Sequence, residues 1–255
     1  KSGSTAETTA LYKYFRQWSR SRYGDNSGDH FVAITDEHSA LHTLAANDGF
    51  REIFLNPADI GGRFSALSLF GLVPAGLIDV DLTRLLERAQ GMFDHHQAMK
   101  DALDLGLLMG RSALAGRDKL TLTFSPQLEP LGPWIEQLVG ESTGKGGRGI
   151  VPVIGETELS AEHYPDDRIF VDAALRGDAR EDYDQAKRLN QLEQNGHPVA
   201  ALRVDDVLDV GAEFLRWQVA TAIAASVMAV NPFDEPDVNA TKQATSQILR
   251  QDPHT

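Results

Sequence analysis

The opening segment of the chain combines hydroxyl groups and glycine directly before a helical pattern. It reads Lys1-Ser2-Gly3-Ser4-Thr5-Ala6-Glu7-Thr8. Backbone N–H groups at the start of a helix, together with hydroxyl donors, favour the binding of a phosphate group. The alternative is that Thr5 serves only as the N-cap of that helix, and this octet alone supports both interpretations equally.

A second segment with the composition of a binding site is Asp59-Ile60-Gly61-Gly62-Arg63-Phe64-Ser65. Paired glycines allow the backbone to approach a ligand, and Arg63 presents a planar guanidinium group that is always charged. Such a residue could bind an anion or stabilise negative charge that develops during a reaction. Taken alone, a Gly-Gly-Arg sequence is more typical of a structural turn.

A third segment, Glu141-Ser142-Thr143-Gly144-Lys145, places a carboxylate at a predicted helix end beside a glycine-rich loop. A general base held on such rigid support is well placed to move a proton. Gln137 precedes Glu141 by four residues, so the two side chains share one helical face. The alternative for Glu141 by itself is a solvated surface acid.

The elements that must position these segments follow the order of an α/β protein. Apolar runs predict strands at His30–Thr35, Arg51–Leu55, Lys119–Phe124, Arg168–Val171 and Val199–Val204. Apolar residues at helical spacing predict helices at Thr5–Arg22, 41–45, Ser65–Leu77, Leu82–Leu114, Trp134–Val139, Ala179–Gln194, Asp209–Val230 and Asp234–Gln251. Strands separated by single helices favour right-handed crossovers and a parallel sheet, so we expect two α/β units joined by helices.

Composition narrows the classes of function. The 255 residues are 42% hydrophobic, enough for a globular core, and the net charge of −13 argues against general binding to nucleic acid or anionic membranes. The chain has no cysteine, and its eight histidines lack the spacing of a helical zinc site, so we expect no metal. The longest apolar stretch, Val219–Val230, is shorter than the roughly 20 residues of a membrane span and predicts a buried helix.

The first residue is Lys1, without an initiator methionine or a signal-peptide pattern. We therefore expect a fragment of a longer chain and a cytoplasmic location.

Taken together, the segments resemble the glucose-6-phosphate isomerase family in both residues and order. Lys1–Thr8 resembles the family's phosphate loop, Asp59–Ser65 its first signature and Gly140–Lys145 the segment of its catalytic glutamate. The residues from Asn231-Pro232-Phe233-Asp234 to Thr241-Lys242-Gln243 resemble its C-terminal signature. The resemblance covers the whole chain and implies two sugar-isomerase (SIS) domains, each a flavodoxin-like parallel sheet sandwiched by helices, the first domain incomplete.

The domain limits that this resemblance implies are 1–75 for the C-terminal part of the first SIS domain and 119–230 for the second. Residues 76–118 would form a helical connection, and 231–255 a C-terminal helix. The stretch Asn56–Leu77 is similar to the isomerase portion of fused transaldolase–isomerase polypeptides of bacterial type, so a transaldolase is a possible fusion partner in the parent protein.

The activity implied by the resemblance is the reversible exchange of glucose 6-phosphate and fructose 6-phosphate through a cis-enediol, in a homodimer without a cofactor. Glu141 matches the family's base, Arg63 the cation beside the enediol, and Lys242 the lysine associated with ring opening. The residues that match substrate contacts are Lys1, Ser2, Thr5 and Gln137 for the phosphate, and Gly62.

Two assignments depart from the family pattern. His163 is the first histidine after Glu141 and is our candidate for ring opening, with His30, His95 and His96 ranked lower and a surface-loop histidine as the alternative. Glu235 stands where better-known members carry glutamine, so it receives no binding role. Two other functions stay open: a non-catalytic SIS-type module that binds a sugar phosphate and regulates a partner, and dual use of mannose 6-phosphate.

Overall fold

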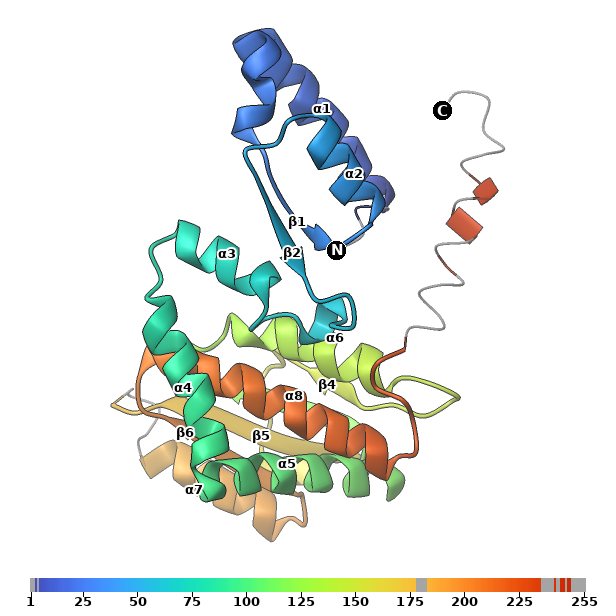
Figure 1. Cartoon of the computed structure of the whole chain (residues 1–255). Helices are drawn as coiled ribbons and strands as arrows, with labels where there is room; N and C mark the ends of the chain where they lie inside the picture. Colours follow the sequence, from blue (N-terminus) through green and yellow to red (C-terminus); the bar gives the residue numbers. More distant parts are fainter. Residues whose placement is uncertain are drawn as a thin grey trace. The chain divides into compact units, whose positions relative to one another are not determined.

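The computed structural model describes residues 3, 5–177 and 183–234, with single positions at 241, 244, 245, 247 and 248. Lys1, Ser2, Glu235 and Lys242 lie outside the described residues, as does most of the helix predicted at Asp234–Gln251. The chain divides into two compact units (Figure 1). The first contains the chain up to Val80, and the second runs from Asp81 to Glu235.

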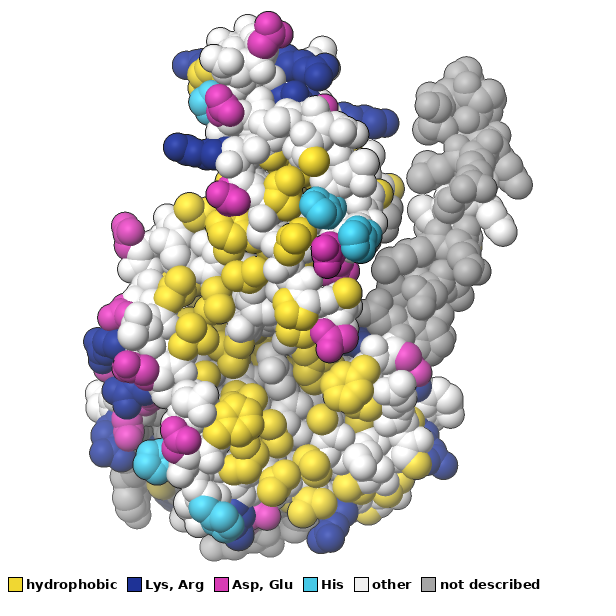
Figure 2. All heavy atoms as spheres, in the orientation of Figure 1, with side chains coloured by type: hydrophobic (Ala, Val, Ile, Leu, Met, Phe, Trp, Pro, Cys, Tyr) yellow, Lys and Arg dark blue, Asp and Glu magenta, His cyan; other side chains and the backbone are white. Residues whose placement is uncertain are grey.

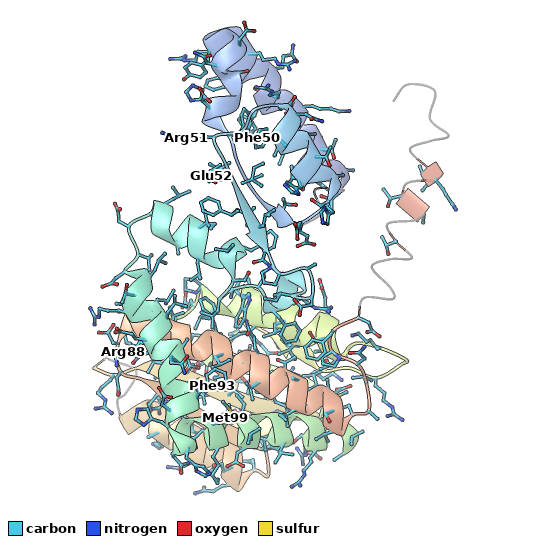
Figure 3. All side chains as sticks on the ribbon, in the orientation of Figure 1. Phe50, Arg51, Glu52, Arg88, Phe93 and Met99 are labelled. Carbon is cyan, nitrogen blue, oxygen red and sulfur yellow. The ribbon has the colours of Figure 1, made fainter. Side chains whose placement is uncertain are left out.

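The first unit is built on two parallel strands, β1 (Val32–Asp36) and β2 (Glu52–Asn56). Helix α1 (Ala6–Tyr23) and the 3-10 helix η1 (Gly24–His30) precede β1, and α2 (Ala40–Asn47) connects the two strands. This confirms the predicted order of helix, strand, helix and strand. Phe50, just before β2 in Figure 3, packs against Phe31 with ring centroids 5.3 Å apart and against Tyr12 at 5.7 Å.

Polar contacts join α1 to the turn after α2. The Tyr12 hydroxyl donates to Asp48, and the Arg16 guanidinium reaches both the Asp48 carboxylate, at 3.4 Å, and its carbonyl oxygen, at 3.2 Å. Arg16 also donates to Ser27 of η1. Burial and the hydrogen bond to Asp48 raise the pKa of Tyr12 to about 12. These contacts of Tyr12 and Arg16 hold α1 beside the strands of the first unit.

After β2 the chain enters a loop that is stabilised by hydrogen bonds of the Asn56 side chain. The Asn56 side chain is buried, accepts from the Leu69 N–H at 3.1 Å and donates to the Pro57 carbonyl at 3.1 Å. The short helix η2 (Gly62–Phe64) follows, and α3 (Leu69–Leu77) begins after Ser68, which serves as its N-cap. The predicted helix at Ser65–Leu77 therefore begins later than expected, because Ser65 closes a turn onto the Gly62 carbonyl.

The second unit contains a four-stranded parallel sheet in the order β4-β3-β5-β6. Its strands are β3 (Lys119–Phe124), β4 (Val151–Val153), β5 (Arg168–Leu175) and β6 (Val199–Val204). The two central strands align Leu120 with Ile169, and both side chains are fully buried. Strand β4 was not predicted, because three residues that include Pro152 carry too little periodicity to indicate a strand.

Helices cover this sheet. They are α4 (Leu82–Asp94), α5 (His96–Leu114), α6 (Leu131–Thr143), α7 (Tyr183–Gln194) and α8 (Val210–Val227), with 3-10 helices η3 (Ala161–His163) and η5 (Val207–Asp209). The single helix predicted at Leu82–Leu114 is two helices, because His95 adopts an extended backbone between them. The β3–α6–β4 and β5–α7–β6 connections run in opposite directions from the centre of the sheet, so right-handed crossovers place α6 and α7 on opposite faces.

Helices α5 and α8 lie in front of the sheet in Figure 1 and pack closely through small residues. A Cβ atom at Gly106 would lie 2.5 Å from the Ala220 carbonyl oxygen, and one at Gly110 would lie 2.9 Å from that of Ala224. Trp217 of α8 is 1% exposed. Figure 2 shows hydrophobic side chains on this face of the second unit; those exposed on α4 and α5 include Leu86, Phe93 and Leu103.

Candidate active site

Helix α6 positions Gln137 and Glu141. It begins directly after Pro130, a residue suited to a helix start, and it extends the helix predicted at Trp134–Val139 at both ends. One face of the helix is buried through Leu131, Ile135, Leu138 and Val139. On another face the Gln137 side chain donates from Nε2 to Glu141 Oε1 at 3.2 Å. Gln137 is exposed and Glu141 is half-buried, so the pair remains accessible to a ligand.

A groove of about 800 Å³ runs along this face of the second unit and includes both residues. Its walls come from α6, from the loop after α6 and from β4. The polar and glycine residues that line it include Asp118, Glu136, Gln137, Glu141, Gly144, Arg148 and Gly149. A carboxylate, an amide and a guanidinium thus border one open space that is large enough for a small polar ligand.

The loop after α6 closes through a tight two-residue turn. Gly146 and Gly147 both have positive φ angles, 60° and 76°, as a type I′ turn requires. Lys145 and Arg148 pair across the turn, with N–O distances of 2.8 and 3.1 Å. Position 149 is also tightly packed, since a Cβ atom there would lie 3.0 Å from the Gly144 Cα.

The two basic residues of this turn were not among the predicted site residues. Arg148 lines the groove with Glu141 and donates to the Met228 carbonyl at 2.9 Å. The Lys145 side chain bonds to the segment after α8. A signal for them existed in the sequence, because Gly146-Gly147-Arg148 repeats the Gly-Gly-Arg pattern that drew attention to Arg63.

Arg63 lies in η2 of the first unit and is 4% exposed. Neither Gly61 nor Gly62 has a positive φ angle, and a Cβ atom at either position would meet nothing within 4 Å. The local backbone therefore does not require glycine at these two positions. The segment forms a turn through the Phe64 N–H bond to the Gly61 carbonyl, and the binding roles of Gly62 and Arg63 stay predictions.

Thr5 is the N-cap of α1. Its side chain accepts from the Thr8 N–H at 3.4 Å and shares a hydrogen bond of 2.7 Å with the Thr8 hydroxyl. The N-cap interpretation is thus realised, and Thr5 is exposed, so its phosphate role stays a prediction. The other two residues predicted in this phosphate loop, Lys1 and Ser2, lie outside the described residues.

His163 ends η3 in the second unit, with 70% of its side chain exposed. Its Nδ1 atom lies 2.6 Å from the Ser160 hydroxyl. A different histidine, His197, is 4% exposed and packs edge-on against Phe170 with ring centroids 5.2 Å apart. The ring-opening role of His163 stays a prediction.

Among residues 3, 5–177, 183–234 and the few described positions beyond them, no three histidine, aspartate or glutamate side chains gather as a metal site would require. Nor does any helix there combine the length and apolar character needed to cross a membrane.

Comparison with solved structures defines the fold class. A hypothetical protein from Thermus thermophilus is similar at 26% identity with a TM-score of 0.82, over 98% of this chain and 70% of that one. A glucose-6-phosphate isomerase from Chlamydia trachomatis, 20% identical, shares the fold at a TM-score of 0.70, over 99% of this chain and 59% of that one. The chain is thus an α/β protein with parallel sheets flanked by helices, as predicted. Its division into two SIS domains stays a prediction.

Proteins of similar sequence agree with the structural comparison. No family model matches the chain. Proteins named glucose-6-phosphate isomerase from Heliobacterium modesticaldum, 28% identical, and Acholeplasma laidlawii, 26% identical, each align over 98% of it. The chain is therefore similar, over nearly its whole length, to proteins named glucose-6-phosphate isomerase. It spans about two thirds of these relatives, 65% and 68% of their lengths.

Proposed function

We propose that the complete gene product interconverts glucose 6-phosphate and fructose 6-phosphate through a cis-enediol. The observation that carries this proposal is the hydrogen-bonded Gln137–Glu141 pair on one accessible face of α6, beside an open groove. A sensor of sugar phosphate requires phosphate contacts but no base. A carboxylate held beside an amide, in a chain whose relatives carry the name of an isomerase, therefore favours the enzyme over the regulatory module.

Glu141 is the base in this proposal. After ring opening, the carboxylate removes the proton from C2 and returns it to C1, so it must be reached by the substrate on one face. Its position near the end of α6 holds the carboxylate on a rigid element, because the opposite face of the helix is buried in the core. Gln137, one turn earlier, then provides an amide donor for the phosphate.

Arg63 stabilises the negative charge that develops on the enediol oxygens. A fixed guanidinium lowers the barrier only to the extent that it binds the transition state more strongly than the substrate. Its burial favours this role, since a cation removed from water acts more strongly on nearby charge. Gly62, where a Cβ atom would meet no other atom, leaves the backbone open to the sugar.

The remaining roles follow the resemblance. Lys1, Ser2 and Thr5 bind the phosphate with Gln137, Lys242 assists ring opening, and His163 is the candidate histidine for that step. The enzyme acts as a cytoplasmic homodimer on a free hexose phosphate and uses no cofactor.

The test is Glu141→Gln in the complete gene product. We expect turnover in a coupled assay to fall by about 10²–10⁴, because proton transfer by a positioned base contributes this much, while the substrate still binds. Glu136→Gln is the matched control: it removes an exposed acid from the same helix and the same groove and should leave turnover nearly unchanged.

Near-normal turnover in Glu141→Gln would refute the assignment of the base. A wild-type protein that binds hexose phosphates without converting them would refute the enzyme proposal. Mannose 6-phosphate belongs in the same assay as a third substrate, since its conversion would show dual specificity.

A further inference from the structure

The Lys145 ammonium group contacts three acceptors, all from residues 231–234. It donates to the Asn231 carbonyl, to the Asp234 carbonyl at 2.9 Å and to the Asp234 carboxylate at 2.6 Å. An ammonium group has three N–H donors, so three acceptors from residues 231–234 can use them all. Only 10% of the side chain is exposed. This geometry differs from that of a surface lysine.

The segment that Lys145 contacts has internal order of its own. The Asn231 side-chain oxygen accepts from the Phe233 N–H at 3.0 Å, which closes a turn around Pro232. Just before it, the Met228 carbonyl at the end of α8 accepts from Arg148. The glycine turn at 146–147 thus presents two cations to one stretch of chain, and a cation at a helix C-terminus is also favoured by the helix dipole.

Lys145 makes these contacts from just beyond the C-terminal end of α6, the helix that carries Glu141. Lys145 follows Glu141 by four residues, and Thr143 fixes the loop by donating to the Val139 carbonyl at 2.7 Å and accepting from the Ile150 N–H at 2.9 Å. The chain continues from Asp234 toward Lys242. The Lys145 contacts therefore tie the segment that leads to one predicted catalytic residue to the helix that bears another.

We propose that Lys145 is a positioning residue, which holds residues 231–234 at the C-terminal end of α6 so that the chain toward Lys242 leaves from a defined place. The catalytic part of this inference rests on the proposed isomerase function. Lys145 acts through the segment that it holds and does not contact the substrate.

The first measurement is independent of activity. Phe233 is 65% exposed, so chymotrypsin can cut after it once the segment is released. In Lys145→Met we expect cleavage at Phe233 about tenfold faster or more, because loss of charge-assisted hydrogen bonds shifts the opening equilibrium by at least that factor. Cleavage at the exposed Tyr14 of α1 should not change and reports on the fold of the first unit.

Two further variants test whether the charge of Lys145, and not the loss of any lysine, causes the change in cleavage. Lys145→Arg keeps a cation and should recover part of the protection at Phe233. Lys100→Met removes a lysine whose ion pair with Asp104, at 2.5 Å, has both side chains more than half exposed, so it should change neither cleavage nor turnover.

The second measurement is kinetic. In the complete gene product, Lys145→Met should lower kcat about tenfold or more, because misplacement of a catalytic group by even about 1 Å is costly to the rate, with KM for fructose 6-phosphate changed less than about twofold. Unchanged cleavage at Phe233 would overturn the proposal, and so would faster cleavage with unchanged kcat. A wild-type protein without isomerase activity would refute the proposed function instead, and the chymotrypsin rates would still decide whether Lys145 holds the segment.

Discussion

At the scale of single residues, Glu213 of α8 is a buried acid that the proposed reaction does not use. It is 2% exposed, and Arg216 donates from Nε to its Oε1 atom at 2.9 Å. Its Oε2 atom is buried without a hydrogen-bond partner in the described part of the chain. Burial raises the pKa of Glu213 above its ordinary value of 4.5, more than the charge and hydrogen bond of Arg216 lower it.

This pKa shift predicts a dependence of stability on pH. A raised pKa in the folded state means that folding is most favourable while Glu213 is protonated. Stability should fall as the pH rises from about 4.5 through the raised pKa. In Glu213→Gln this fall should be absent, so the difference between the two proteins grows over that range. Urea unfolding at several pH values between 4 and 8 measures it.

A matched control for this series is Glu87→Gln. Glu87 lines the same cavity of about 450 Å³ as Glu213 but is exposed on α4. Its replacement should leave the pH profile of the wild type intact. Parallel profiles for wild type and Glu213→Gln would show that Glu213 titrates alike in the folded and unfolded states, contrary to our expectation.

At the scale of elements, the contact between α5 and α8 depends on the absence of side chains at Gly106 and Gly110. Two helices approach this closely only where one presents hydrogen in place of a Cβ atom. The atoms opposite include backbone carbonyl oxygens and Cβ atoms of α8, which cannot rotate aside. This packing sets the position of α8, whose end leads into the segment held by Lys145.

We therefore expect Gly106→Ala to destabilise the protein by about 1–3 kcal/mol, the usual cost of overpacking, despite the better helix propensity of alanine. Gly91→Ala in α4 is the control, because a Cβ atom there would be 3.9 Å from its nearest neighbour. That variant should be stabilised by about 0.5–1 kcal/mol. Urea unfolding of both variants measures the two effects, and destabilisation of equal size would contradict this account.

At the scale of the whole molecule, the two units differ in how much core they bury. The first unit has a two-stranded sheet, and its α1 exposes Leu11, Tyr14, Phe15 and Trp18 by half or more. The second unit has a four-stranded sheet whose central strands are almost wholly buried. Two-stranded sheets are marginally stable by themselves. The first unit should therefore unfold locally at a lower free-energy cost than the second unit.

Native-state hydrogen exchange can test this difference. Amides of β1 and β2 should exchange through smaller openings, with protection about tenfold lower or more than that of amides in β3 and β5, because less apolar surface must be exposed. Glu52, at the start of β2 in Figure 3, and Ile169 of β5 mark the two regions. Equal protection in both sheets would mean that the chain opens as one cooperative unit.

Sequence alone determined the α/β class, because buried parallel strands read as apolar runs and amphipathic helices repeat at 3.6 residues. It also placed Gln137 and Glu141 on one helical face, since that relation is local. It missed β4, which is too short to show a period, and the break at His95, which periodicity does not reveal. The fold class was predictable because it rests on patterns within single elements.

Only the tertiary structure decided what surrounds the predicted residues. The three acceptors of Lys145 lie 86 and 89 residues away in the chain, and no spacing rule connects such positions. The same holds for the burial of Glu213 and for the close contact of Gly106 with Ala220. Local chemistry follows from residue type and period, whereas charge environment and packing depend on which distant segments meet, and that is settled by the free energy of the whole fold.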